Sequence, residues 1–193
     1  KQMTYDVNHP KTSQPTPGDF KKTYDFISSH YSSIISIHLS KKVSGTYQSA
    51  VNAAKKIKKN KIHIIDSYSA SVGLGLLVMH AVDLKQSGKS YNEIMDEVIK
   101  KQKETEMFLL LDDLRYAVSG GRVPSKVKTI ANLFRLKPML TANKKGKLNI
   151  KLSDIKTASN IFQFIYFVFK TFKIPNTSYL LVCITPYTFL SFL

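Results

Sequence analysis

Apolar positions in the first half of the chain follow two kinds of pattern. Short continuous apolar runs are typical of buried strands, and apolar residues three or four apart are typical of helices packed on one side. The predicted strands cover residues 33–39, 61–66 and 107–111. The predicted helices cover residues 16–28, 44–57 and 74–84, and a further helix begins at residue 90. Strands that alternate with helices in this way predict βαβ units and a parallel sheet.

The pattern changes after about residue 90, where a helix-rich stretch leads to a hairpin. Segments 137–141 and 148–152 are short apolar strands, with Gly146 in the turn between them. The sequence therefore predicts an α/β fold, with a parallel sheet flanked by helices and a second α+β domain. The predicted units are residues 1–88, residues 89–157 and an atypical hydrophobic tail over residues 158–193. The tail permits either a helix to about residue 172 and a strand at 179–184, or an abnormal end.

Two hydroxyl-rich stretches lie where loops turn into helices, at residues 12–19 and 44–50. Each places small hydroxyl side chains and free backbone N–H groups at a helix N-terminus, which is the local chemistry of an anion site. The alternative interpretation is that these serines and threonines only cap helices and form turns. Capping alone does not explain two such loops at the carboxyl ends of neighbouring strands, which is where open α/β sheets bind ligands.

Composition and charge leave a second function class open. The chain has 193 residues and a formal net charge of +16, from 29 Lys and Arg against 13 Asp and Glu. Such a charge suggests a basic nucleic-acid-binding protein, although lysines scattered over solvated faces are the stronger explanation. The lone Cys183 excludes a disulfide within the chain. No signal-peptide pattern is present, and the apolar run at residues 161–169 is far shorter than the ~20 residues of a membrane span. We therefore expect a cytoplasmic protein.

Other chemistries fit the chain less well. Gly73 and Gly75 follow a strand and open a helix, but Val78 stands where a dinucleotide-binding loop needs its third glycine. Ser44 lacks the Gly-x-Ser-x-Gly elbow of a hydrolase nucleophile. His38, at the end of a strand, either donates to a ligand or packs as a polar core residue. The histidines and carboxylates have no metal-ligand spacing, so we expect no metal and no cofactor.

Five segments, in order, resemble the signatures of the DegV family of fatty-acid-binding proteins. The matching segments are Thr12-Ser13-Gln14-Pro15-Thr16-Pro17-Gly18-Asp19-Phe20, residues 37–50 around Ser44-Gly45-Thr46, residues 65–75, Gly120-Gly121-Arg122-Val123 and Lys137-Pro138-Met139-Leu140. The resemblance covers residues 5–152. It implies a two-domain α/β protein that binds a long-chain fatty acid and is not itself an enzyme.

The resemblance also implies which residues carry the function. Thr12, Ser13, Ser44 and Gly45 are the candidates for holding the fatty-acid carboxylate, and the acyl chain is expected in an apolar tunnel between the domains. Some members of the family are the acyl-carrier subunit of a bacterial fatty acid kinase, whose partner subunit supplies ATP. Arg122 and His38 are the candidates for facing that partner or a phosphate. The candidate tunnel-lining residues are Phe20, Leu74, Leu77, Val78, Phe108 and Leu110.

The chain also departs from the family pattern at both ends. Members of the family begin with a strand that carries a Thr-Asp-Ser-Thr segment upstream of the first hydroxyl loop, and they carry a Gly-Thr-His segment near the end. Neither segment is recognisable here. The chain is therefore expected to be a fragment, with both domains partial and one sheet edge exposed.

Overall fold

The computed structural model describes residues 12–58, 60–105, 107–110, 115–124, 126, 138–142, 146–152, 181–184 and 188–191. One prediction, the tail helix to about residue 172, lies outside the described residues.

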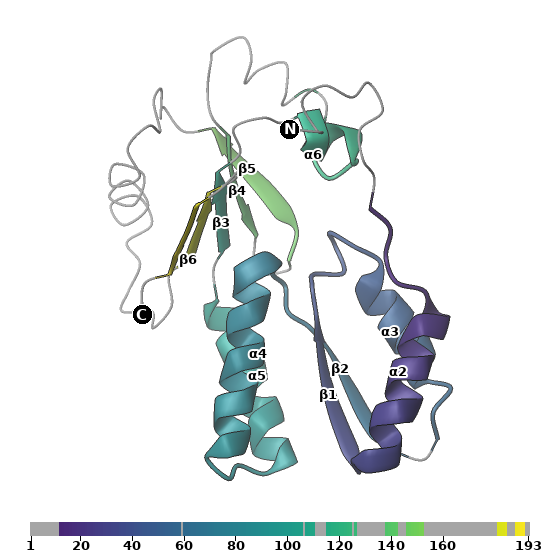
Figure 1. Ribbon diagram of the computed structural model, residues 1–193. Helices are drawn as coiled ribbons and strands as arrows, with labels where there is room; N and C mark the ends of the chain where they lie inside the picture. The colour runs from purple at the N-terminus through teal and green to yellow at the C-terminus, as the bar shows by residue number, and fades with distance from the viewer. Residues whose placement is uncertain are drawn as a thin grey trace.

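The first unit of the fold is a two-stranded parallel sheet between two pairs of helices (Figure 1). Strand β1 (Ser33–His38) pairs in parallel with β2 (Lys61–Asp66), so that their carboxyl ends, His38 and Asp66, lie side by side. The helices of this unit are α2 (Pro17–His30), α3 (Thr46–Ala54), α4 (Ser71–Gln86) and α5 (Tyr91–Glu104). The predicted βαβ order and parallel sheet are therefore confirmed.

Side chains alternate across β1, and each face has its own core. Ile34 packs with Tyr24 of α2 and with Ala50 and Ala53 of α3. On the opposite face, Ile35 and Ile37 pack on a buried cluster from β2 and α5, made up of Ile65, Ile94, Met95 and Val98. Period-two alternation thus places α2 and α3 on one face and α5 on the other. Although the sequence assigned α5 to the second domain, it packs on the first sheet; the domain bounds stay a prediction.

Local capping signals fix where two of the helices begin. Thr16 caps α2 by accepting a hydrogen bond from Asp19 N, and the Asp19 carboxylate accepts one from Thr16 N. Ser90 and Glu93 form the same capping box at the start of α5. Helix α4 differs from the prediction, because it begins at Ser71 within the stretch that the sequence analysis interpreted as a loop.

The second unit is a mixed five-stranded sheet in the order β5-β4-β3-β6-β7. Its strands are β3 (Met107–Leu110), β4 (Pro138–Ala142), β5 (Leu148–Leu152), β6 (Leu181–Ile184) and β7 (Thr188–Ser191). Strands β4 and β5 form the predicted antiparallel hairpin, and β6 pairs in parallel with β3. The short helix α6 (Arg115–Ser119) precedes the Gly120-Gly121 turn.

The hairpin turn of the second unit contacts the loop that follows β1. The Ser40 hydroxyl is fully buried and donates a hydrogen bond to the carbonyl of Gly146 at 2.7 Å. Gly146 has a φ of +73°, in the left-handed region that favours glycine. This contact anchors the second unit beside the carboxyl ends of β1 and β2.

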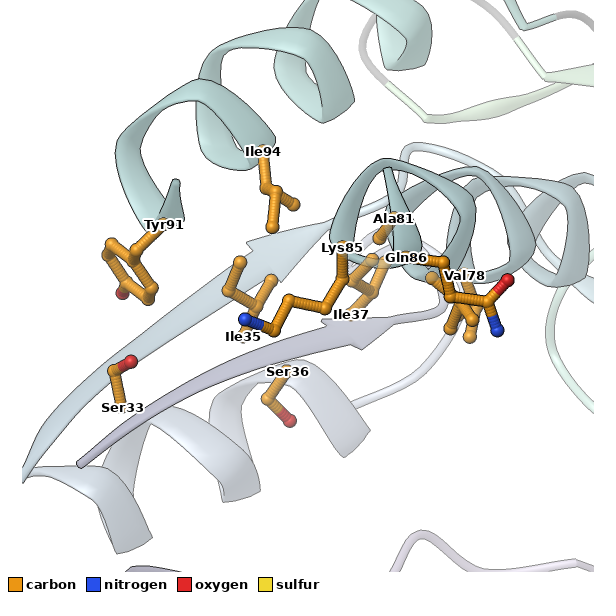
Figure 2. Close-up of a pocket in the computed structure, with 11 residues that line it drawn as sticks. Ser33, Ile35, Ser36, Ile37, Val78, Ala81, Lys85, Gln86, Tyr91 and Ile94 are labelled. Carbon is orange, nitrogen blue, oxygen red and sulfur yellow. The ribbon is translucent and has the colours of Figure 1, made fainter. Parts of the chain in front are cut away.

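One edge of β1 borders an open apolar groove, of about 720 Å³, between the sheet and α4 (Figure 2). Ile35 and Ile37 form its floor, and Val78 and Val82 of α4 line its wall while remaining 41% and 48% exposed. Within the described residues, β1 pairs with β2 alone. The predicted exposed sheet edge stays a prediction. Among the helices that the structure describes, none combines the length and apolar character needed to cross a bilayer.

Candidate functional site: two hydroxyl loops at the carboxyl end of the first sheet

The loop from Ser40 to Gly45 connects β1 to α3 and carries the second hydroxyl motif. Ser44 Oγ accepts a hydrogen bond from the backbone N–H of Thr46 at 3.3 Å, and the two hydroxyl oxygens, Ser44 Oγ and Thr46 Oγ1, lie 2.9 Å apart. Ser44 therefore forms a turn just before α3, whose N-cap residue is Gly45 and has no side-chain cap. Turn formation is part of the alternative interpretation of this loop. Ser44 also lies at the strand end that the binding interpretation requires, so the two interpretations are compatible.

Residues 12–16 form an extended segment that leads directly into the capped N-terminus of α2. Thr12 and Ser13 are exposed there, with their side chains accessible to a ligand. The two loops are joined by Gln14, whose Nε2 donates a hydrogen bond to Ser49 Oγ on α3 at 3.2 Å. The structure thus brings Gln14, which directly follows Thr12 and Ser13, against Gly45 and Ser49, although these residues are more than thirty positions away in the sequence.

Gln14 is a site residue that the sequence analysis quoted but did not assign. Its side-chain amide lies against Gly45, so closely that a Cβ at Gly45 would be 1.8 Å from Gln14 Oε1. Gly45 is therefore the residue that lets the first loop lie on the start of α3. The sequence contains both partners, Gln14 in the first motif and Gly45 in the second. No local sequence pattern indicates that they are in contact.

His38 lies at the end of β1 but faces α2 and is 9% exposed. Its Nε2 is 2.8 Å from Ser36 Oγ and 3.3 Å from the hydroxyl oxygen of Tyr24, and the Phe20 ring packs edge-on against it. Burial lowers the pKa of His38 and raises that of Tyr24. These contacts fit a polar core residue, which was one of the two interpretations of His38; its role toward a partner stays a prediction.

Arg122 lines a second hollow, of about 880 Å³, between the two units. Lys42 and Val43, immediately before Ser44, form one side, and Arg122 and Lys147 lie on the side of the second unit. The guanidinium of Arg122 donates to the carbonyl of Gly120 within the same turn. The structure therefore places Arg122 across a basic hollow from the second hydroxyl loop.

Asp66, at the end of β2, is a buried charge near this edge that the sequence analysis did not assign. Its Oδ1 accepts a hydrogen bond from Tyr68 N at 3.0 Å, and Lys41 Nζ lies 3.7 Å from its Oδ2. Tyr68 and Ser71 both have positive φ, at 53° and 51°. Within the described residues, no three His, Cys, Asp or Glu side chains gather as potential metal ligands.

The candidate tunnel-lining residues do not lie along one surface. Phe20 packs on the α2–α3 face of the first sheet, whereas Val78 lines the groove on the opposite face. One tunnel cannot include both, because the sheet lies between them. Leu77 is fully buried within the protein. The side chains of Phe108 and Leu110 lie outside what the structure describes.

The glycines of the predicted nucleotide-like loop lie inside helix α4. Gly73 is buried, and a Cβ there would be 2.2 Å from Ser69 Oγ. This glycine allows the helix to pack closely on the preceding loop.

Comparison with known proteins identifies the family. A family model described as "Uncharacterised protein, DegV family" matches residues 1–184. The chain belongs to the DegV family. A DegV domain-containing protein of Staphylococcus aureus strain COL is 34% identical over 155 residues, which make up 80% of this chain and 54% of the relative. This DegV chain thus spans about half the length of the curated relatives it matches.

Solved DegV structures share the fold. A structure described as the fatty acid binding of a DegV family protein from Thermus thermophilus is 27% identical, with a TM-score of 0.75, and the match covers 89% of this chain and 59% of that one. DegV of Bacillus subtilis, described as a fatty acid binding protein, is 29% identical with a TM-score of 0.70, and the match covers 84% and 57%. Neither description refers to nucleic acid, so that alternative gains no support.

Proposed function

We propose that this DegV chain binds a long-chain fatty acid, with the carboxylate held by Thr12, Ser13, Ser44 and Gly45. The observation that carries the proposal is the bridge from Gln14 to Ser49, which brings the two hydroxyl loops together at the carboxyl end of β1. Open α/β sheets bind their ligands at the carboxyl ends of the strands. The descriptions of the Thermus thermophilus and Bacillus subtilis relatives as fatty acid binding support the choice of ligand.

The hydroxyl pair on the second loop suits a carboxylate. A hydroxyl carries one proton and two lone pairs. When the Thr46 hydroxyl donates the 2.9 Å hydrogen bond to Ser44 Oγ, the Ser44 hydroxyl is free to donate a hydrogen bond to a ligand oxygen. Each hydrogen bond in such a chain polarises the next one. Backbone N–H groups at the start of α3 add favourable partial positive charge for the same anion.

The acyl chain supplies most of the affinity in this proposal. Burial of each CH₂ contributes about 0.8 kcal/mol, so a C16 chain contributes about 12 kcal/mol before the cost of association. A hydrogen bond to a charged group contributes about 1.5–3 kcal/mol. The acyl chain therefore determines how tightly the fatty acid binds. The two loops determine which end of the fatty acid is held.

The basic hollow provides a place for the phosphate chemistry of a partner. We propose that Arg122, with Lys42 and Lys147, faces the phosphoryl group when a fatty acid kinase phosphorylates the bound acid. The kinase supplies ATP, and this chain acts as the carrier rather than as an enzyme. His38 is buried beneath α2, so it supports the fold of the site from inside.

Lipid binding is tested on the chain as purified, by native mass spectrometry and by palmitate titration. The Thr12→Ala/Ser44→Ala double variant is expected to bind palmitate at least about tenfold more weakly, because it loses donors to a carboxylate. Ser87→Ala is the matched control, since Ser87 ends α4 and bonds only within its own turn, to the Leu84 carbonyl. A wild-type chain that carries no acyl group and takes up none contradicts the proposal.

The role of Arg122 is tested separately. Arg122→Ala is expected to leave palmitate affinity within about twofold of the wild-type value, because burial of the acyl chain dominates the affinity. The same variant should be phosphorylated much more slowly by a fatty acid kinase. An unchanged rate of acyl phosphate formation rules out a phosphate-facing role for Arg122.

A further inference from the structure

Gln14 makes a contact that neither hydroxyl motif explains. Its Nε2 reaches Ser49 Oγ at 3.2 Å, across 35 residues of sequence. Ser49 lies in the first turn of α3 and is 2% exposed, so its hydroxyl is almost removed from water. A buried hydroxyl needs a hydrogen-bond partner, and Gln14 supplies one from outside the helix.

The fit between Gln14 and Gly45 is equally specific. A Cβ at Gly45 would be 1.8 Å from Oε1, 2.5 Å from Cδ and 2.7 Å from Nε2 of Gln14. The amide therefore lies against Gly45, just after Ser44, in space that the Cβ of any other residue would occupy. Pro15 favours extended backbone at Gln14, which reduces the backbone freedom of the residue that carries the amide.

We infer that Gln14 is a positioning residue, which holds the Thr12–Ser13 loop on the first turn of α3 and so sets the geometry of the carboxylate site. This inference rests on the proposed function. Without the bridge, residues 12–16 have no regular secondary structure to hold them, because α2 begins only at Pro17. The hydroxyls of the first loop then lose their fixed position relative to Ser44.

The amide group suits this role better than a charged group of the same shape. A neutral amide donates to Ser49 and places no negative charge beside the ligand carboxylate. Gln14→Glu keeps the size and can still accept a hydrogen bond from Ser49, but it adds a like charge next to the anion. Gln14→Ala removes the bridge without adding charge. The two variants therefore separate positioning from electrostatics.

The test compares palmitate with the C16 alcohol, which has the same tail and no carboxylate. Gln14→Ala and Ser49→Ala are each expected to weaken palmitate binding about fivefold, the loss of one hydrogen bond worth about 1 kcal/mol. Because both remove the same bridge, the double variant should lose no more than either single one. Gln14→Glu should weaken palmitate binding further. Affinity for the alcohol should stay within about twofold in all of them.

Gly45→Ala gives an independent check. Its Cβ displaces the Gln14 amide, so it should weaken palmitate binding in the wild type and have little further effect in a Gln14→Ala background. Circular dichroism and thermal midpoints confirm that each variant is folded. Equal palmitate affinity of Gln14→Ala and the wild type overturns the inference alone, as does an equal loss for palmitate and the alcohol. No palmitate binding by the wild type overturns the proposed function and this inference together.

Discussion

Gly146 is the residue where one added methyl group should separate the two units of the fold. It lies in the turn between β4 and β5 with a φ of +73°, and its carbonyl accepts the hydrogen bond from buried Ser40. A Cβ at Gly146 would be 2.3 Å from Ser40 Oγ and 2.9 Å from the Cα of Tyr68. The second contact is with backbone, so a side-chain rotation cannot relieve it. Gly146→Ala should therefore push the hairpin away from the loops that follow β1 and β2.

The size of the effect follows from two separate costs. A non-glycine residue in the left-handed region costs roughly 1–2 kcal/mol. Inserting a methyl group into a well-packed contact costs about 1–3 kcal/mol, and movement that relieves it gives up the Ser40 hydrogen bond instead. We expect Gly146→Ala to lower the free energy of unfolding by about 2–5 kcal/mol.

Gly88→Ala is the matched control for the backbone cost. Gly88 has a φ of +82°, and a Cβ there would meet nothing within 4 Å. It should therefore show only the left-handed cost of roughly 1–2 kcal/mol. The measurement is urea unfolding of both variants, followed by circular dichroism, with hydrogen exchange reporting on the amides near Ser40. Equal destabilisation by the two substitutions would refute the reasoning, because it would mean that the contact with Ser40 and Tyr68 contributes nothing.

Three further outcomes follow from the described contacts. Burial lowers the pKa of His38 below its usual 6.5, so the unfolded chain binds a proton first and stability should fall as pH drops below about 6.5. A urea series from pH 8 to pH 5 should show a weaker decline for His38→Gln. Hydrogen bonds from the Ser90 hydroxyl and backbone N–H, together with Lys89, hold the pKa of Glu93 at about 2. Ser90→Ala removes only the hydroxyl and should therefore raise that pKa part of the way toward 4.5 in an NMR titration. Val82→Lys, which charges the open groove beside β1, should change the free energy of unfolding by less than about 0.5 kcal/mol in the same urea experiment, because Val82 is 48% exposed.

The elements that local signals specify are the ones that the sequence predicted well. The capping boxes at Thr16–Asp19 and Ser90–Glu93 each depend on residues three apart, so the start of α2 and of α5 could be predicted directly. Strands β1 and β2 follow from continuous apolar runs. The start of α4 was predicted too late because Gly73 weakens the helical pattern, whereas in the fold it packs against Ser69.

The sequence could not assign the candidate tunnel-lining residues to one face of the sheet, for a related reason. An apolar residue at helical spacing is identified as facing a core, but the spacing does not say which face of a sheet that core covers. Phe20 and Val78 belong to helices on opposite faces of β1, and that arrangement depends on how successive helices cross the sheet. Periodicity could predict that Phe20 and Val78 each pack against other apolar residues. It could not predict that they do so on opposite faces of the sheet.

The contacts around the candidate site join residues that are far apart in the sequence, and local sequence patterns do not predict such contacts. Gln14 meets Gly45 and Ser49, and Ser40 meets Gly146, which are pairs separated by about 31, 35 and 106 positions. In two of them a glycine removes the side chain that would keep the loops apart. Each glycine looks locally like a turn or a helix start, and only the fold supplies the group that approaches it. A chain that uses missing side chains to bring its loops together can place residues from separate sequence motifs side by side.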